Sequence, residues 1–166
     1  TNIKLADTRK TTPGLRIFEK YAFKCGGGVN HRMGLYDAAM IKENHIAWTD
    51  NLNSAVKRIR LNSPFTTHII IEAENIEQAK EAVLAGADSV LLDELSPETI
   101  KKSVQELRDL SINSLKKEVN KNLIIEVSGI NPQEISKYLI KGIDLISTSS
   151  SITKSNWIDL SMRYIN

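Results

Sequence analysis

The chain has 166 residues, of which 41% are hydrophobic and 25% charged, so its length and composition are those of one globular domain with a continuous core. Its longest apolar runs, such as Ile69-Ile70-Ile71, are too short to span a membrane, and its single cysteine excludes an internal disulfide and a four-cysteine zinc site. The net charge of +2 gives no general case for nucleic acid. We therefore expect a cytoplasmic protein with neither a membrane nor a nucleic-acid partner.

Short apolar segments alternate with segments of helical character along the chain. The predicted strands are residues 3–6, 38–41, 68–72, 89–92, 123–127 and 145–147. The predicted helices are residues 52–61, 77–85, 97–107 and 132–140. Ser96-Pro97 and Asn131-Pro132 are typical helix starts, and Gly86 and Gly142 suit helix ends. Strand–helix alternation favours parallel strands joined by helical crossovers.

Charged or hydroxyl side chains stand at or just past the C-terminal end of every predicted strand. They are Asp7, Lys42, Glu72, Asp93, Glu126 with Ser128, and Ser147 with Thr148. This arrangement is typical of an α/β barrel, whose site lies at that rim. Because only six strands are visible, we predict an α/β fold with an open or incomplete (β/α) barrel of parallel strands. A closed barrel and a doubly wound sheet are the alternatives, since a doubly wound sheet also binds ligands at its C-terminal strand ends.

The first 45 residues contain most of the candidate chemistry. They have 8 Lys and Arg against 4 Asp and Glu, whereas the rest of the chain has 14 against 16. Arg9 and Lys10 precede the turn Pro13-Gly14, and His31-Arg32 follows three glycines. Arginine offers a planar fork for a carboxylate or phosphate, and lysine a mobile charge. The cluster predicts a site for a multiply charged anion; a solvated basic turn and a structural histidine are the alternative interpretations.

Three further charged residues follow predicted strands, and each has two interpretations. Lys42 ends an apolar strand, so it is expected to meet either a ligand anion or a neighbouring acid, Glu72 or Asp93. Glu72 and Asp93 suit Mg²⁺ together with substrate phosphate oxygens. Alternatively, the two acids stabilise the dipoles of the helices that follow them. Ser128-Gly129 and the hydroxyl-rich residues 147–151 suit a phosphate monoester at helix N-termini.

Taken together, these motifs resemble the quinolinate phosphoribosyltransferase family, also called carboxylating nicotinate-nucleotide pyrophosphorylases. The matching runs are DTRKTTPGLR at residues 7–16, EKYA at 19–22, GGG at 26–28, NHR at 30–32 and IKENH at 41–45, followed by Glu72, Asp93, Ser128-Gly129, residues 144–147 and Leu160. The matching runs follow one another in the order of the family and together span essentially the entire chain. The resemblance implies an open, mostly parallel α/β barrel, a homodimer or larger homo-oligomer, and Mg²⁺ bound with 5-phosphoribosyl-1-pyrophosphate.

The resemblance also implies a reaction and a role for each matching residue. The family joins quinolinate to 5-phosphoribosyl-1-pyrophosphate, releases pyrophosphate and carbon dioxide, and forms nicotinate mononucleotide for NAD biosynthesis. By this resemblance Arg9, His31 and Arg32 hold the quinolinate carboxylates, Lys10 and Lys42 face carboxylate or pyrophosphate, Glu72 and Asp93 bind ribose hydroxyls and Mg²⁺, and Ser128 and Gly129 hold the 5-phosphate. We count Lys10, Lys42, Glu72 and Asp93 as catalytic candidates, and Ser147 and Ser149 as further substrate-binding candidates.

The chain departs from the family pattern in three places. Ser128-Gly129-Ile130 has one glycine fewer than the usual Ser-Gly-Gly-Ile, and residues 147–151 are hydroxyl-rich where many members have glycine. The family also has an N-terminal domain, which covers the barrel mouth of a neighbouring subunit and is expected to be absent here. We expect residues 1–166 to be the catalytic barrel domain; a phosphoribosyltransferase for another heterocycle and a truncated, non-catalytic anion-binding domain are the alternatives.

Overall fold

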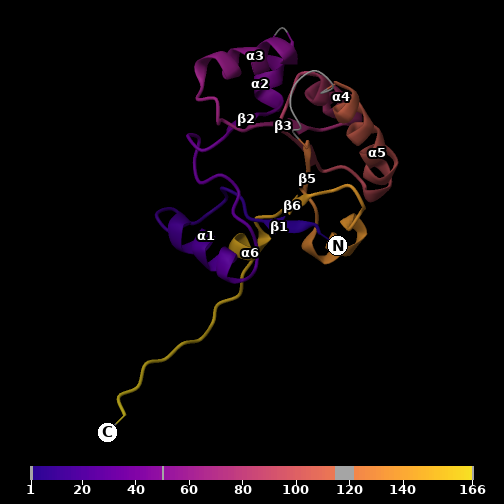
Figure 1. Ribbon diagram of the computed structural model, residues 1–166. Helices are drawn as coiled ribbons and strands as arrows, with labels where there is room; N and C mark the ends of the chain where they lie inside the picture. Colours follow the sequence, from indigo (N-terminus) through magenta and orange to yellow (C-terminus); the bar gives the residue numbers. More distant parts are fainter. Residues whose placement is uncertain (1, 50, 115–121, 166) are drawn as a thin grey trace.

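The computed structural model describes residues 2–49, 51–114 and 122–165 and contains one sheet of six parallel strands (Figure 1). The strands are β1 (Lys4–Ala6), β2 (Ala39–Ile41), β3 (Ile69–Ala73), β4 (Ser89–Asp93), β5 (Ile124–Ser128) and β6 (Leu145–Ser147). The helices are α1 (Arg16–Cys25), α2 (Glu43–Ala47), α3 (Leu52–Asn62), α4 (Ile76–Leu84), α5 (Pro97–Ser114), the 3₁₀ helix η1 (Pro132–Tyr138) and α6 (Ser150–Thr153). All six predicted strands are confirmed to within one residue at each end.

The strand order is β1-β6-β5-β4-β3-β2, so β2 to β6 pair in the order of the chain and β1 joins beyond β6. This is the cyclic order of a barrel. Within the described residues, however, β1 and β2 remain unpaired with each other, and the sheet stays open between them. The open parallel barrel is therefore confirmed, and the closed barrel and the doubly wound sheet are excluded.

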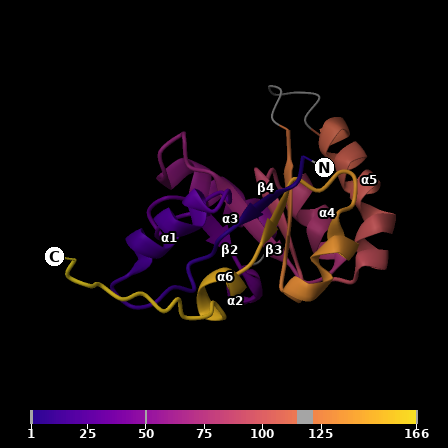
Figure 2. The same cartoon turned by 90° about the horizontal axis from the view of Figure 1, so that it is seen from below.

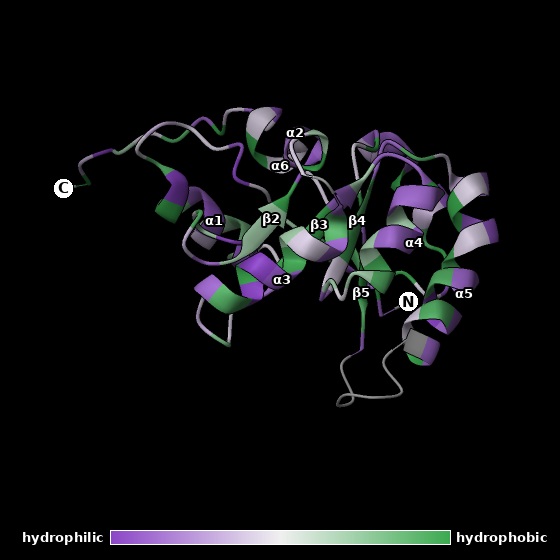
Figure 3. Ribbon diagram, turned by 90° about the horizontal axis from the view of Figure 1, so that it is seen from above, coloured by the Kyte–Doolittle hydropathy of each residue, from purple (hydrophilic) through white to green (hydrophobic). Residues whose placement is uncertain are grey.

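The two faces of the sheet differ in what they contact. Ile71 and Leu92, on one face, belong to the main core with the buried side of α4 and α5. Ile70 and Leu91, on the other face, form a small separate cluster with Met40 packed against it. Because side chains alternate along a strand, Glu72 and Asp93 share this second face. Figure 3 shows the apolar strands beside helices such as α4 and α5, in which polar and apolar residues alternate.

The predicted helices are confirmed with two differences in extent and type. Helix α5 continues to Ser114 because Leu110 and Ser111 prolong its packed side. Residues 132–138 form a 3₁₀ helix, which Asn131 caps through its side chain. Ser96 caps α5 by accepting a hydrogen bond from Thr99 N at 3.2 Å. No helix in the described part of the chain is both long and apolar enough to cross a membrane.

Helices α1, α2 and α6 were not predicted, and α1 shows why. It buries Lys20, whereas Ile17, Phe18 and Tyr21 are each about 70% exposed. This is the reverse of the pattern by which an amphipathic helix is recognised. Helices α2 and α6 have only five and four residues, too few to show a period.

Residues 155–165 run away from the body of the molecule without helix or strand (Figure 2). Their apolar side chains lie in solvent, with Trp157 and Met162 fully exposed and Leu160 85% exposed. Large apolar side chains are thus exposed both on α1 and on this segment.

Candidate functional site

A cavity of about 300 Å³ lies at the C-terminal ends of the strands. Its lining comes from the loop before β2, from the last three positions of β2 to β6, and from residues just after β1 and β2: Thr8, Arg9, Lys10, His31, Arg32, Met40, Lys42, Glu72, Leu91, Asp93, Glu126, Ser128 and Ser147. Nine of the eleven candidate site residues are in this set; Gly129 and Ser149 are not. The fold thus brings together residues separated by up to 139 positions, from Thr8 to Ser147.

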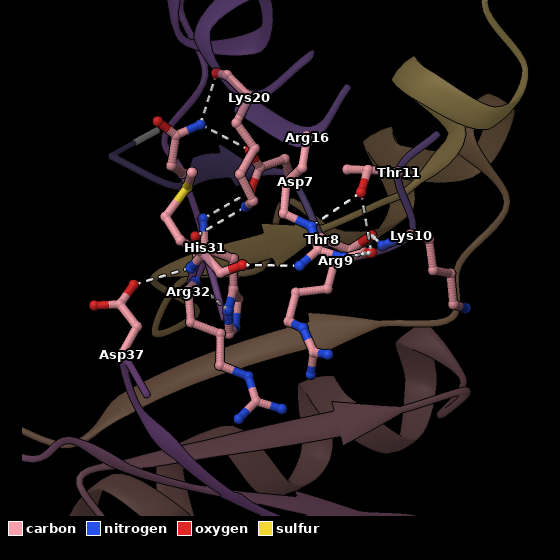
Figure 4. Close-up of polar contacts among 12 residues, drawn as sticks. Asp7, Thr8, Arg9, Lys10, Thr11, Arg16, Lys20, His31, Arg32 and Asp37 are labelled. Atoms are coloured by element: carbon pink, nitrogen blue, oxygen red, sulfur yellow. Dashed lines mark hydrogen bonds and ion pairs between the residues drawn. The ribbon is translucent and has the colours of Figure 1, made fainter. Parts of the chain in front are cut away.

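Two arginines from different loops share the cavity, and their side chains extend in the same direction (Figure 4). Arg32 is fixed from behind, because its Nη1 donates to Ala38 O at 2.8 Å and its Nη2 lies 3.4 Å from Met40 Sδ. Burial lowers the pKa of Arg32, the nearby Arg9 lowers it further, and Glu72 opposes both effects. Arg9 Nε is buried without a hydrogen-bond partner. Two partly desolvated guanidinium groups held close together favour an anionic ligand.

His31 is held in one orientation by bonds to both ring nitrogens. The backbone N–H of Arg32 donates to Nδ1 at 2.8 Å, and Nε2 lies 3.3 Å from Glu126 Oε2. Since a backbone N–H can only donate, Nδ1 must be the accepting nitrogen, and the ring proton belongs on Nε2. His31 therefore donates its ring N–H to Glu126, and this bond sets the orientation of the imidazole in the cavity wall.

Glu126 is the main site residue to which sequence analysis gave no role. Its side chain is 2% exposed, and one carboxylate oxygen, Oε1, has no hydrogen-bond partner. Glu126 pairs in register with Leu91, on the same face as the apolar floor of the cavity. The signal was a single carboxylate inside the apolar run Ile124-Ile125-Glu126-Val127. A buried carboxylate oxygen is costly unless it accepts a hydrogen bond, so Oε1 suits a donor group of a ligand.

Lys42 and Glu72 form the ion pair that was one of the two interpretations of Lys42, with Nζ and Oε2 2.5 Å apart. Burial nevertheless raises the pKa of Glu72; Lys42 opposes this effect, and repulsion from Asp93 adds to it. The carboxylates of Glu72 and Asp93 are therefore close enough to interact. The alternative role of Glu72 and Asp93 was to stabilise the dipoles of the helices that follow them. The acidic residues in the first turns of α4 and α5 are instead Glu77 and Glu98.

The loops after β4 and β5 pack against each other beside Asp93. Glu94 has a φ of 55° and Gly129 a φ of 71°, both in the left-handed region, and Glu94 N donates to Ser128 O at 3.2 Å. A Cβ atom at Gly129 would lie 2.5 Å from Glu94 Cγ and 3.0 Å from Asp93 Oδ1. Gly129 thus permits the approach of the two loops, while Ser149 lies after β6 as the residue that precedes α6.

The acidic side chains of the cavity fit a metal ion that takes some of its ligands from a substrate better than one held by protein side chains alone. No group of three or more His, Cys, Asp or Glu suited to a metal ion occurs in residues 2–49, 51–114 and 122–165. Glu72 and Asp93 are a carboxylate pair at neighbouring strand ends. Mg²⁺ commonly binds one or two carboxylates and completes its shell with phosphate oxygens and water. The pair therefore fits Mg²⁺ that arrives with a phosphorylated substrate.

Comparison with known proteins assigns the chain to a family. Residues 1–163 match the family model described as quinolinate phosphoribosyl transferase, C-terminal domain. The chain belongs to the quinolinate phosphoribosyl transferase family. Its similarity to quinolinate phosphoribosyl transferases covers the cavity residues of every strand, since the match extends beyond Ser147.

Individual members of the quinolinate phosphoribosyl transferase family support this assignment. The chain is 44% identical over 161 residues to a probable nicotinate-nucleotide pyrophosphorylase (carboxylating) of Methanothermobacter thermautotrophicus, covering 96% of this chain and 55% of that protein. It is 38% identical over 163 residues to the protein of that name from Synechocystis, covering 98% and 52%. The crystal structure of NadC from Streptococcus pyogenes superposes with a TM-score of 0.85 at 38% identity, covering 98% and 53%. The chain thus spans about half the length of the relatives it matches.

Proposed function

We propose that the chain contains the site at which a phosphoribosyl group passes from 5-phosphoribosyl-1-pyrophosphate to quinolinate, with decarboxylation to nicotinate mononucleotide in NAD biosynthesis. One observation carries the proposal: the same cavity holds the guanidinium groups of Arg9 and Arg32 and the carboxylate pair Glu72 and Asp93. Quinolinate is a dianion, which the two guanidinium groups would bind. The two carboxylates would bind the ribose and its metal ion. Family membership supports this pairing of functions.

The cationic wall is proposed to bind and orient quinolinate. Arg9 and Arg32 would make charge-assisted hydrogen bonds to its carboxylates, and Lys10 would add a mobile positive charge. His31 would lie beside these carboxylates and would give them its Nε2–H in exchange for its bond to Glu126. Met40 and Leu91 give an apolar surface for the pyridine ring.

The acidic rim is proposed to bind the phosphoribosyl donor. Asp93 and Glu72 would accept hydrogen bonds from ribose hydroxyls and contact Mg²⁺, while Ser128 with Gly129 would hold the 5-phosphate. Ser147 and Ser149 are further candidates for phosphate contacts, and only Ser147 lines the cavity. Lys42 would exchange its bond to Glu72 for one to pyrophosphate. When bound, Mg²⁺ would stabilise the charge on the departing pyrophosphate.

Catalysis would come mainly from orientation and electrostatics. Arg9 and Arg32 would hold the ring nitrogen of quinolinate against the anomeric carbon of the ribose, which turns a reaction of two molecules into one within a complex. The cations would stabilise charge that moves to the leaving group. The positively charged pyridinium ring would then accept the electron pair of the bond to the adjacent carboxylate, which leaves as carbon dioxide, and the ring carbon would take up a proton from water in its place. This scheme requires no general base.

We also propose that the protein acts in the cytoplasm as a homodimer or larger homo-oligomer. The apolar side chains of Ile17, Phe18 and Tyr21 on α1 are exposed, as are those of residues 157–165, and such surfaces support an assembly. The single cysteine, Cys25, is exposed and free, which suits a reducing compartment.

The direct test is formation of nicotinate mononucleotide from quinolinate, 5-phosphoribosyl-1-pyrophosphate and Mg²⁺, measured for residues 1–166 and for the complete gene product. We expect turnover in the complete gene product and its loss in Arg9→Ala. Nicotinate should serve as a control substrate, because it lacks the second carboxylate. Equal turnover of nicotinate would favour a transferase for another heterocycle, and binding of both ligands without turnover a non-catalytic domain.

A further inference from the structure

A buried ion pair lies outside the cavity, between β1 and α1. Asp7 is fully buried and Lys20 is 1% exposed, and Nζ of Lys20 lies 2.5 Å from Oδ1 of Asp7. Neither residue lines the cavity. Burying two charges costs free energy that their attraction repays only with good geometry and further hydrogen bonds. The partners that supply those bonds therefore indicate what the pair does.

Those partners all belong to the loop that contains His31. Asp7 Oδ1 accepts from the backbone N–H of His31 at 2.7 Å, and Lys20 Nζ donates to the His31 carbonyl at 2.9 Å (Figure 4). Asn30 Nδ2 donates to Asp7 Oδ2 at 2.7 Å and to the carbonyl of Lys20 at 2.8 Å. Both backbone polar groups of His31 are thus bonded to one ion pair.

The same pair also fixes the first cationic segment. Asp7 directly precedes Thr8, Arg9 and Lys10, and its own N–H donates to Val29 O at 3.2 Å. The end of β1 and the segment 29–31 are therefore joined by backbone and side-chain bonds. A guanidinium fork binds a carboxylate well only when both are placed to within a fraction of an ångström.

We propose that Asp7 and Lys20 are positioning residues, which hold the loop of His31 and Arg32 against the segment of Arg9 so that all three side chains face one dicarboxylate. The inference rests on the proposed function for the identity of that ligand. It assigns the buried lysine of α1, which has no place in the mechanism, to the geometry of the dicarboxylate site. The two residues act through His31 and Arg32 and make no contact with the ligand themselves.

Paired substitutions separate positioning from stability. Lys20→Met or Asp7→Leu alone should destabilise the protein, because each leaves a buried charge unpaired, whereas the double variant should regain much of that stability. If the pair positions the loop, the double variant should still bind quinolinate at least tenfold more weakly, with pyrophosphate binding unchanged. Recovery of quinolinate binding together with stability would overturn the proposal. Lys80→Met with Glu106→Leu, a partly exposed pair on α4 and α5, is the matched control and should change neither quantity.

A second measurement needs no substrate. In the double variant the amide of His31 should exchange with solvent faster than in the unsubstituted protein, and the ¹⁵N signals of its ring should no longer report a single Nε2–H tautomer. The amides of β3 to β5 should keep their protection. Unchanged His31 exchange and tautomer in a folded double variant would refute the positioning role. Because this test is independent of quinolinate, it remains decisive if the unsubstituted protein binds no quinolinate, which would overturn only the proposed function.

Discussion

The guanidinium group of Arg32 lines the cavity and is held in place by its contacts with Ala38 and Met40. Its planar shape should therefore matter as much as its charge. Replacing Arg32 by lysine keeps the positive charge and removes the planar fork. We expect Arg32→Lys to weaken quinolinate binding by about 1–3 kcal/mol, the range for a charge-assisted hydrogen bond. Titration calorimetry checks the loss, with Arg163→Lys in the exposed segment 155–165 as control. Unchanged quinolinate affinity would contradict the role given to Arg32.

Asp93 is proposed to contact the phosphoribosyl donor and its metal rather than quinolinate. Asp93→Asn keeps the size of the side chain and removes its charge, so it should weaken binding of 5-phosphoribosyl-1-pyrophosphate with Mg²⁺ more than binding of quinolinate. Separate titrations with each ligand measure this difference. An equal loss for the two ligands would show that Asp93 supports the cavity as a whole.

The stability of the folded protein should depend on pH through Glu72, because burial raises the pKa of this side chain in the folded state. The folded state then binds the proton more tightly than the unfolded state, and this contribution to stability is fully present below the ordinary glutamate pKa of about 4.3. It is lost as the pH rises through the raised pKa. The difference in unfolding free energy between the unsubstituted protein and Glu72→Gln should therefore fall as the pH rises over that interval. Urea unfolding at a series of pH values tests this, and a difference that rises with pH would disprove it.

At the scale of elements, the loops after β4 and β5 depend on Gly129. An alanine there must adopt a left-handed backbone, at a cost of about 1–2 kcal/mol, and its Cβ would also meet Glu94 and Asp93. Gly86→Ala is the matched control, since Gly86 has a φ of 85° and nothing within 4 Å of the added Cβ. We expect both variants to lose stability by chemical denaturation, and only Gly129→Ala to lose affinity for the phosphoribosyl donor. Equal behaviour of the two would mean that the loop contact is unimportant.

The strands and most of the cavity residues were predictable from the sequence, whereas some of the helices were not. Runs such as Ile69-Ile70-Ile71 followed by Glu72 show both a buried strand and the end at which its polar residue lies. Helix α1 was missed because its buried side contains Lys20. Glu126 was seen at a strand end without a role, since only the fold shows that its partner is His31, 95 positions earlier. Local pattern thus predicted the elements, and long-range pairing decided the site.

At the scale of the whole molecule, the exposed apolar residues predict how residues 1–166 behave alone. Without a cover over the cavity, water would screen its charges, and the apolar side chains of α1 and residues 157–165 would remain exposed. We expect this polypeptide to bind phosphate-bearing ligands weakly, turn over quinolinate hardly at all, and self-associate. Sedimentation velocity and a product assay check the three expectations. A monodisperse monomer with turnover equal to that of the complete gene product would show that the barrel needs no cover.

The strand order also has a consequence for how the protein reaches its native state. Within the described residues, the ladder of β1 is formed with β6, through Lys4 with Leu145 and Ala6 with Ser147, and a single bridge joins Ala6 to Val29. Strand β1 therefore stays incompletely paired until β6, far along the chain, has joined it. Contacts this distant in sequence form slowly, because the entropy of closing the intervening loop is lost first. Arg9 and Lys10, which follow β1, thus reach their final position relative to the other cavity residues when the sheet is complete, and an anion that binds them together with those residues would select chains that have finished folding.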